Sequence, residues 1–286
     1  MRYIAGIDSG SGFTKAVVLS AMEGARPEIV GRGIVRTGVR MEEAARNALD
    51  AALVEARLEN DQIGYIATTG FGRYGIGFRD IQITEITSGA RGAFYLFPET
   101  STVLDIGSQS TRATALKEGG RVRTFKTNDK CAAGSGSFIV RAAKYLQIGI
   151  EEVGEAALRA TNPQPISSVC AVLAESEIIN HVSAGVSVED ILRGIYDSLA
   201  DRSALLLKRT GATGAVTFIG GVARQRGMVS ALEERLKLNV NVPEDCIYVC
   251  AIGAALLGLR RFEAKGSHIL SAVSKPIASE GVAGGV

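Results

Sequence analysis

A short pattern occurs twice in this chain, at residues 6–19 and at residues 103–116, which lie 97 positions further on. In each copy an apolar strand reaches an aspartate, a turn of small residues follows, and a second apolar strand leads away. The aligned pairs are Asp8 with Asp105, Thr14 with Thr111, Lys15 with Arg112, and Leu19 with Leu116. The pattern predicts two similar β-hairpins with a carboxylate beside each turn, which together can grip one polyphosphate from opposite sides.

The elements around the two hairpins follow the same order, which predicts two related halves. In the first half the sequence indicates strands at 2–8, 13–20, 28–35 and 65–70 and helices at 41–58 and 85–96. In the second half it indicates strands at 102–106, 111–117, 121–127 and 215–219, long helical segments, and a final helix from 251. We expect an α/β protein with domains at 1–97 and 98–265 and a ligand cleft between them. The helix at 251–263 is expected to pack back on the first domain, and 266–286 to form a flexible tail.

Composition indicates an ordinary soluble protein without a nucleic-acid partner. Apolar residues make up 46% of the chain, the net charge is +2, and no basic run stands out. No apolar run is long enough to cross a membrane, and the N-terminus lacks the features of a signal peptide. We therefore expect a cytoplasmic protein whose four cysteines are reduced or metal-bound rather than disulfide-paired.

Each repeated aspartate stands at a strand end beside glycine, a position suited to phosphate chemistry. Aspartate is disfavoured in strands and costly to bury unpaired, but it can hold a hydrated Mg²⁺ or orient a water near a γ-phosphate. Glycine lets backbone N–H groups approach phosphate oxygens closely. The expected binding residues around the first aspartate are Gly10, Ser11, Gly12, Thr14 and Lys15. For one copy alone, a β-turn anchored by aspartate is the alternative; the second copy and a later Gly220-Gly221-Val222 element favour nucleotide binding.

Two other nucleotide-binding patterns are absent from the sequence. The chain has no Gly-x4-Gly-Lys-Ser/Thr loop, which excludes a P-loop enzyme. The Gly10-x-Gly12 pair lacks the third glycine of a dinucleotide fingerprint and precedes a strand rather than a helix.

Two cysteines lie at or just before predicted helix starts, Cys131 and Cys170. The positive end of a helix lowers the pKa of a thiol and favours a bound anion. The two residues are 39 positions apart without CxxC spacing, so two buried small hydrophobic residues are the alternative. Two thiolates cannot complete a four-cysteine cluster site, but a symmetric dimer with both residues from each chain could. The other two cysteines, Cys246 and Cys250, have helical spacing and are interpreted as structural.

Three elements of the chain resemble motifs of the acetate kinase, sugar kinase, Hsp70 and actin superfamily. They are the phosphate-1 motif around Asp8, the phosphate-2 motif around Asp105 with Gly107 and Ser108, and the adenosine motif at Gly220, Gly221 and Val222. The resemblance implies a duplicated RNase H-like, actin-like ATPase fold with ATP or ADP and Mg²⁺ in the cleft between the domains.

Two longer segments, 128–136 and 166–177, are similar to the signature segments of one family within that superfamily. This is the family of 2-hydroxyacyl-CoA dehydratase activators and ATP-binding subunits of benzoyl-CoA reductase. The resemblance implies that Cys131 and Cys170 ligate one [4Fe–4S] cluster shared between two subunits. It also implies that Gly134, Ser135 and Gly136 lie beside the nucleotide phosphates. Asp8, Asp105 and Gln109 are the implied catalytic residues, with Gln109 sensing the γ-phosphate.

The function implied by this resemblance is ATP-driven electron transfer. Ferredoxin or flavodoxin would donate the electron, and a CoA-thioester dehydratase or reductase component would receive it. The dimer would be either two identical chains or a pair with a similar subunit. Two alternatives stay open from the residues themselves: a small-molecule kinase of the sugar kinase type without a cluster, and a nucleotide-binding interaction protein without redox activity.

Overall fold

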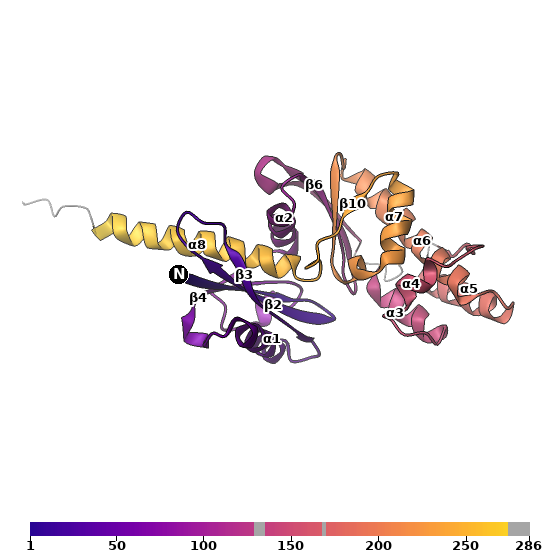
Figure 1. Ribbon diagram of the computed structural model, residues 1–286, viewed down its shortest axis with the longest axis horizontal. Coiled ribbons are helices and arrows are strands. Elements are labelled where there is room, and N and C mark those ends of the chain that lie inside the picture. Colours follow the sequence, from indigo (N-terminus) through magenta and orange to yellow (C-terminus); the bar gives the residue numbers. More distant parts are fainter. Residues whose placement is uncertain (129–134, 168–169, 274–286) are drawn as a thin grey trace, which may run out of the picture.

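The computed structural model describes residues 1–128, 135–167 and 170–273, which form two five-stranded sheets (Figure 1). The strands of the first sheet are β1 (Arg2–Ser9), β2 (Phe13–Ala21), β3 (Glu28–Arg36), β4 (Ile63–Thr69) and β5 (Ile81–Gln82), in the order β3-β2-β1-β4-β5. The strands of the second sheet are β6 (Thr100–Ile106), β7 (Thr111–Lys117), β8 (Arg121–Asn128), β9 (Ala215–Ile219) and β10 (Val240–Asn241), in the order β10-β9-β6-β7-β8.

The two sheets share one topology, so the repeat seen in the sequence extends to the whole fold. The first three strands of each half form an antiparallel meander, and the first strand also pairs in parallel with the fourth. Read from its other edge, the second sheet has the order β8-β7-β6-β9-β10, which corresponds strand by strand to β3-β2-β1-β4-β5 of the first. This arrangement confirms the expected fold class, an α/β protein built from two related halves.

The register of each hairpin places a cation directly opposite its aspartate. Asp8 on β1 is paired with Lys15 on β2, and Asp105 on β6 is paired with Arg112 on β7. Side chains directly opposite each other on antiparallel strands lie close enough to interact. The charge pairing at the two turns therefore follows from strand register alone.

The first sheet lies between two helices, α1 (Met41–Ala56) and α8 (Val249–Val273). The face toward α1 buries apolar residues such as Ile7 and Leu49, and the face toward α8 buries residues such as Ile4 and Ile252. Strand β3 comes very close to α1 because it carries glycine: a Cβ placed on Gly33 would lie 1.9 Å from the carbonyl oxygen of Ala48.

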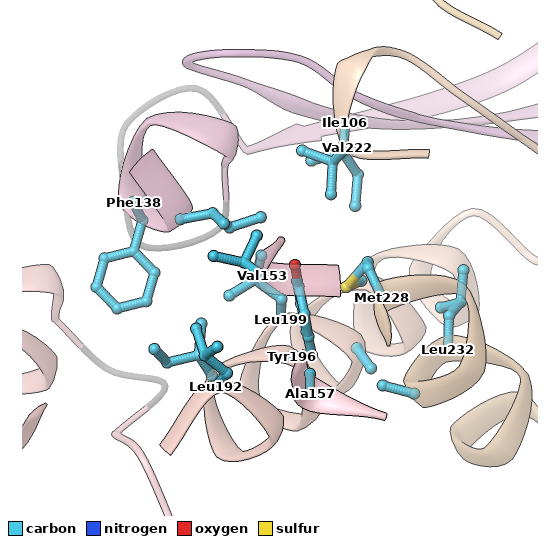
Figure 2. Close-up of a cluster of buried hydrophobic side chains, with 14 of the residues drawn as sticks. Ile106, Phe138, Val153, Ala157, Leu192, Tyr196, Leu199, Val222, Met228 and Leu232 are labelled. Carbon is cyan, nitrogen blue, oxygen red and sulfur yellow. The ribbon is translucent and has the colours of Figure 1, made fainter. Parts of the chain in front are cut away.

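The second sheet is covered on one face by α2 (Glu85–Leu96) and on the other by the helices that follow β8. These helices are α3 (Gly136–Tyr145), α4 (Val153–Ala157), α5 (Ala171–Ser183), α6 (Val188–Arg209) and α7 (Arg226–Leu236). Their shared core gathers large side chains from several elements, among them Phe138, Tyr196 and Met228 (Figure 2). This core anchors α3 and α5, the two helices that follow the cysteine segments.

The two halves exchange their last helices. Helix α2 ends the first half of the chain but packs on the second sheet, whereas α8 ends the second half and packs along β1, β2 and β4 of the first sheet (Figure 1). The two helices also pack against each other, and glycine makes this crossing close. A Cβ on Gly92 would lie 2.1 Å from the carbonyl oxygen of Val249, and a Cβ on Gly253 would lie 1.8 Å from that of Ser88.

Helix α8 continues to Val273, so the segment from residue 266, which we expected to be a flexible tail, begins as helix. The first proline after the start of α8 is Pro276, and nothing earlier forces the helix to stop. Residues 274–286 lie outside the described part of the chain. Among the described residues, no helix has the length and apolarity that a bilayer crossing requires.

The α2–α8 crossing gives a stability prediction. Gly253→Ala should lower the free energy of unfolding by at least ~2 kcal/mol, because its methyl group would overlap the Ser88 carbonyl and the backbone must shift. Helix propensity alone would favour alanine by ~1 kcal/mol, so a loss identifies the backbone contact. Urea unfolding measures the effect. The control is Gly75→Ala, where a Cβ would meet no atom within 4 Å; an equal effect in both variants would contradict the prediction.

Candidate functional site

The two aspartate-bearing turns face each other between the halves of the molecule. A Cβ placed on Gly12 of the first turn would lie 3.1 Å from Ser108 Oγ of the second. The turns are built alike, because Gly10 N–H donates to the carbonyl of Phe13 (3.2 Å) and Gly107 N–H donates to that of Ser110 (2.9 Å). The hairpins that the sequence pattern predicted therefore meet tip to tip.

Each aspartate forms an ion pair with the cation across its hairpin. The distance from Lys15 Nζ to Asp8 Oδ2 is 2.7 Å, and that from Arg112 Nη1 to Asp105 Oδ2 is 3.4 Å. All four side chains are largely buried. The site thus holds two carboxylates and two cations in a small volume shielded from water, where charges interact strongly.

The charges of the two hairpins act on each other. Burial raises the pKa of Asp105, the Arg112 guanidinium opposes that rise, and the negative charge of Asp8 adds to it. Burial disfavours the charged form of Lys15, but the carboxylate of Asp8 outweighs burial and raises the pKa of the Lys15 amine. Lys15 therefore stays a cation, available to a ligand that carries negative charge.

A glycine packs against each aspartate at the end of the strand that pairs in parallel with the aspartate's own strand. Gly70 follows β4 and Gly220 follows β9, and both have a φ of +92°. A Cβ on Gly70 would lie 2.5 Å from Asp8 Oδ1, and one on Gly220 would lie 2.6 Å from Asp105 Oδ1. Glycine is needed at both positions for its left-handed backbone and for the space that the carboxylate occupies.

The hydroxyl of Thr14, which we expected to face phosphate, supports the first turn from behind. The hydroxyl of Thr37 donates to the carbonyl oxygen of Gly10 (2.6 Å), so the hydroxyl of Thr14 donates to Thr37 Oγ1 (2.9 Å). Thr14 is fully buried, whereas Ser11 at the tip of the turn is exposed. The turn is therefore held from the protein side and presents its tip outward.

The start of α3 is fastened to the second turn. Gly136 N–H donates to the carbonyl of Gly107 (2.9 Å), and Ser137 N–H donates to that of Ser108 (2.8 Å). A Cβ on Gly136 would lie 3.2 Å from Val222 Cγ2, so the segment after β9 meets α3 and the second turn at one point.

The remaining expected nucleotide residues are placed around this point. Gly220 N–H donates to the carbonyl of Cys246 (2.9 Å), Gly221 begins a short 3₁₀ turn, and Gln109 is exposed at the tip of the second turn. Ser135, the residue before α3, is buried. Gly134 lies outside the described residues.

The two predicted cluster ligands are not both described. Cys170 is the N-cap residue of α5, partly buried, and its carbonyl accepts the Ala174 N–H (3.0 Å). Cys131 lies outside the described residues. Within the described ranges, no group of three or more His, Cys, Asp or Glu side chains is arranged to hold a metal ion.

A comparison with known proteins identifies the family. The sequence pattern of the BadF/BadG/BcrA/BcrD ATPase family matches residues 5–258, which is most of the chain. The chain belongs to the BadF/BadG/BcrA/BcrD ATPase family. The resemblance noted for the cysteine segments is thereby confirmed at the level of the family.

Members of this ATPase family resemble the chain along nearly its whole length. A benzoyl-CoA reductase subunit of Thauera aromatica is 41% identical over 271 residues, covering 92% of this chain and 95% of that protein. The 2-hydroxyisocaproyl-CoA dehydratase activator of Clostridioides difficile is 37% identical over 254 residues, covering 89% and 94%. A solved structure of a Clostridium difficile activator of this dehydratase, with bound ADPNP, superposes with a TM-score of 0.87 at 34% identity and covers 97% of this chain and all of that one.

The structure of this family member adds residues that sequence reasoning did not select. Glu85 accepts hydrogen bonds from Arg73 (3.0 Å) and from Arg112 (3.3 Å), directly beside the second aspartate. Arg112 had a signal in the sequence, because it aligns with Lys15 in the repeat. Glu85 and Thr37 had none, since only the folded chain brings them to the turns.

The two cysteines interpreted as structural should resist alkylation in the folded protein. Burial raises the pKa of Cys246 to about 11 and raises that of Cys250 well above its ordinary value. Since only the thiolate reacts, iodoacetamide at pH 8 should modify both residues at least ~100-fold more slowly in the native protein than in urea. Mass spectrometry of the labelled peptides measures this, and rapid labelling of either residue in folded protein would contradict it.

Proposed function

We propose that this chain is an ATP-hydrolysing iron–sulfur protein that drives a low-potential electron into a CoA-thioester dehydratase or reductase. The observation that carries the proposal is Cys170 at the first turn of α5, in an ATPase-family chain whose two aspartate hairpins meet. A nucleotide site and a thiol at a helix start are the two parts that such a function requires.

The nucleotide would bind as ATP or ADP with Mg²⁺ where the two turns meet. Backbone N–H groups at the tips of the turns, those of Ser11, Gly12 and Ser108, would contact phosphate, and Lys15 would add its charge. Gly10 and Gly107 would close the two turns through their own N–H groups and let the phosphate approach closely. Asp8 and Asp105 would hold Mg²⁺ or its water, and Gln109 would contact the γ-phosphate. The segment 220–222 would line the adenosine, and 134–136 would lie beside the phosphates. The similarity of nearly the whole chain to an activator solved with bound ADPNP supports binding of an adenine nucleotide.

Removing one carboxylate tests the nucleotide half of the proposal. Asp8→Asn and Asp105→Asn should each lower the ATPase rate by at least ~100-fold, because each removes a charge that positions Mg²⁺ or water. Asp197→Asn is the matched control, since Asp197 pairs with Arg193 on the outside of α6 and should leave the rate within about twofold. Phosphate release under anaerobic conditions measures the rates. Unchanged rates in the two site variants would refute these assignments.

Cys131 and Cys170 of two subunits would hold one [4Fe–4S] cluster. The described ligand fits this role: Cys170 is partly buried, and it is the N-cap residue of a helix whose positive end favours a bound anion. When bound, such a cluster supplies the uptake and release of one electron. The residues of this chain would hold it at a subunit interface and shield it from water.

An apolar outer face on α5 supports assembly with a second subunit. The inner face of the helix buries Ala174 and Ile178, yet apolar side chains also project outward, including Val172 (68% exposed) and Ile179 (50% exposed). A helix that is apolar on opposite faces is expected to be covered on both. A second copy of this chain or a similar subunit, docked along α5, would cover this face and bring the second pair of cysteines to Cys170.

The α5 face gives a test of the dimer. Ile179→Glu should convert the dimer to a monomer and remove bound iron, because the interface would have to bury an unpaired charge. Leu205→Glu is the control, since Leu205 is similarly exposed on α6 and lies away from α5 in sequence. Light scattering after gel filtration and iron analysis are the measurements. A dimer that persists in Ile179→Glu would place the interface elsewhere.

Removing the described ligand tests the cluster directly. Cys170→Ser should lose iron and acid-labile sulfide on anaerobic purification while keeping its affinity for ADPNP within about twofold, because Cys170 lies outside the nucleotide turns. The same measurement separates the proposal from a kinase of the sugar kinase type, which needs no cluster. A well-folded wild-type dimer that contains no iron would refute the redox function.

The protein partners follow from the same proposal. A cytoplasmic ferredoxin or flavodoxin would supply the electron, and the catalytic component of a CoA-ester dehydratase or reductase would accept it. The relatives that support this are named as a benzoyl-CoA reductase subunit and as dehydratase activators. ATP would act through the two halves, which are joined by the α2–α8 crossing and can change their relative orientation around the nucleotide.

A further inference from the structure

Glu85 is the first residue of α2 and lies between the two aspartate hairpins. Each hairpin, with its aspartate and the cation paired to it, is called a half-site of the proposed nucleotide site. Its side chain is 16% exposed, and each of its carboxylate oxygens accepts a hydrogen bond from a different arginine. Arg73 Nη1 donates to Oε2 at 3.0 Å, and Arg112 Nη2 donates to Oε1 at 3.3 Å. A carboxylate can accept from two guanidinium groups in this way, whereas an amide has a single acceptor oxygen.

The two arginines connect Glu85 to opposite sides of the site. Arg73 belongs to the first half, and its Nη1 also donates to the carbonyl of Gly70 (2.8 Å), the glycine that backs Asp8. Arg112 belongs to the second hairpin and also donates to Asp105 (3.4 Å). Continuous contacts therefore run from Asp8 through the Gly70 loop, Arg73, Glu85 and Arg112 to Asp105.

The internal repeat shows that this connection is not needed to build the hairpin. In the first hairpin, Lys15 pairs with Asp8 at 2.7 Å and also donates to the Phe13 carbonyl (3.3 Å) within the same turn. In the second, Arg112 divides its donors between Asp105 and Glu85. The same topology thus forms with a local cation in one half and with a bridging cation in the other.

The position of α2 explains why a bridge here would respond to movement between the halves. The helix comes from the first half of the chain, packs on the second sheet and crosses α8. Any change in the relative orientation of the halves must alter the Arg73–Glu85 contact, the Arg112–Glu85 contact, or both. If the Arg112–Glu85 contact breaks, Asp105 is already close enough to accept hydrogen bonds from both terminal nitrogens of Arg112.

We propose that Glu85 is a positioning residue that couples the two aspartate half-sites. It holds Arg112 partly away from Asp105, which sets the orientation of that carboxylate, and it holds Arg73, which fixes the loop behind Asp8. The inference rests on the proposed nucleotide site and deepens it, since it assigns to this contact the recognition of the γ-phosphate state. A nucleoside triphosphate would contact both half-sites and so would need them aligned, whereas binding of a diphosphate would depend less on that alignment.

The test compares binding of Mg·ADPNP and Mg·ADP to full-length wild-type protein and variants by calorimetry. In Glu85→Gln the preference for ADPNP over ADP should fall by about tenfold, mainly through weaker ADPNP binding, because both half-sites contact the longer polyphosphate. Arg73→Gln should reduce the same preference, since it breaks only the link to the first half. Glu85→Asp, which keeps the charge, should restore part of it. Glu155→Gln, in an exposed pair with Arg226, should leave it unchanged.

The outcomes separate this inference from the proposed function. Folded Glu85→Gln or Arg73→Gln protein with the wild-type preference, or with equally weakened binding of both nucleotides, would overturn the coupling role and leave the nucleotide site intact. If Glu85→Gln does not fold, the ratio of ADPNP to ADP affinity in Arg73→Gln and Glu85→Asp tests the coupling role in its place. Wild-type protein that binds neither nucleotide would overturn the proposed function and the coupling role together.

Discussion

The close crossing of α2 and α8 is the contact on which the arrangement of the two halves depends. Each helix is continuous in sequence with one half and packs on the sheet of the other, so their crossing connects the two sheets. Gly92 and Gly253 let the two backbones approach to a distance that any side chain would prevent. Glu85 and Cys250 belong to the first turns of these two helices and lie close to the aspartates of the two hairpins.

Charge balance then shapes the site that this crossing creates. Two buried carboxylates close to one another would be unstable alone, and strand register gives each a cation on the neighbouring strand. The cations also provide what a polyphosphate requires, so the same residues that stabilise the fold can serve a ligand. In the proposed complex the phosphate groups would compete with Asp8 and Asp105 for Lys15 and Arg112, and a divalent cation held by the freed carboxylates would offset part of the added negative charge.

Much of the fold could be predicted because local patterns and tertiary structure agree. The hairpins alternate apolar and small residues, and their strands lie within one or two residues of the predicted bounds. The two-residue strands β5 and β10 were missed because so short a segment has no periodicity, and only the neighbouring strand defines them. The residues of the repeat were correctly placed at the two turns for the same reason that the strands were. Glu85 was not found, since its contacts with Arg73 and Arg112 join segments that no spacing in the sequence relates.

The exchange of terminal helices also bears on how the chain folds as it is synthesised. The first sheet has one face covered early, by α1, but its other face stays bare until residues 249–259 emerge at the far end of the chain. Helix α2 is made early, yet the sheet it covers is completed only when β9 and β10 are translated. Neither half can therefore mature alone on the ribosome, and the nascent chain must carry exposed apolar surface until both partners are present.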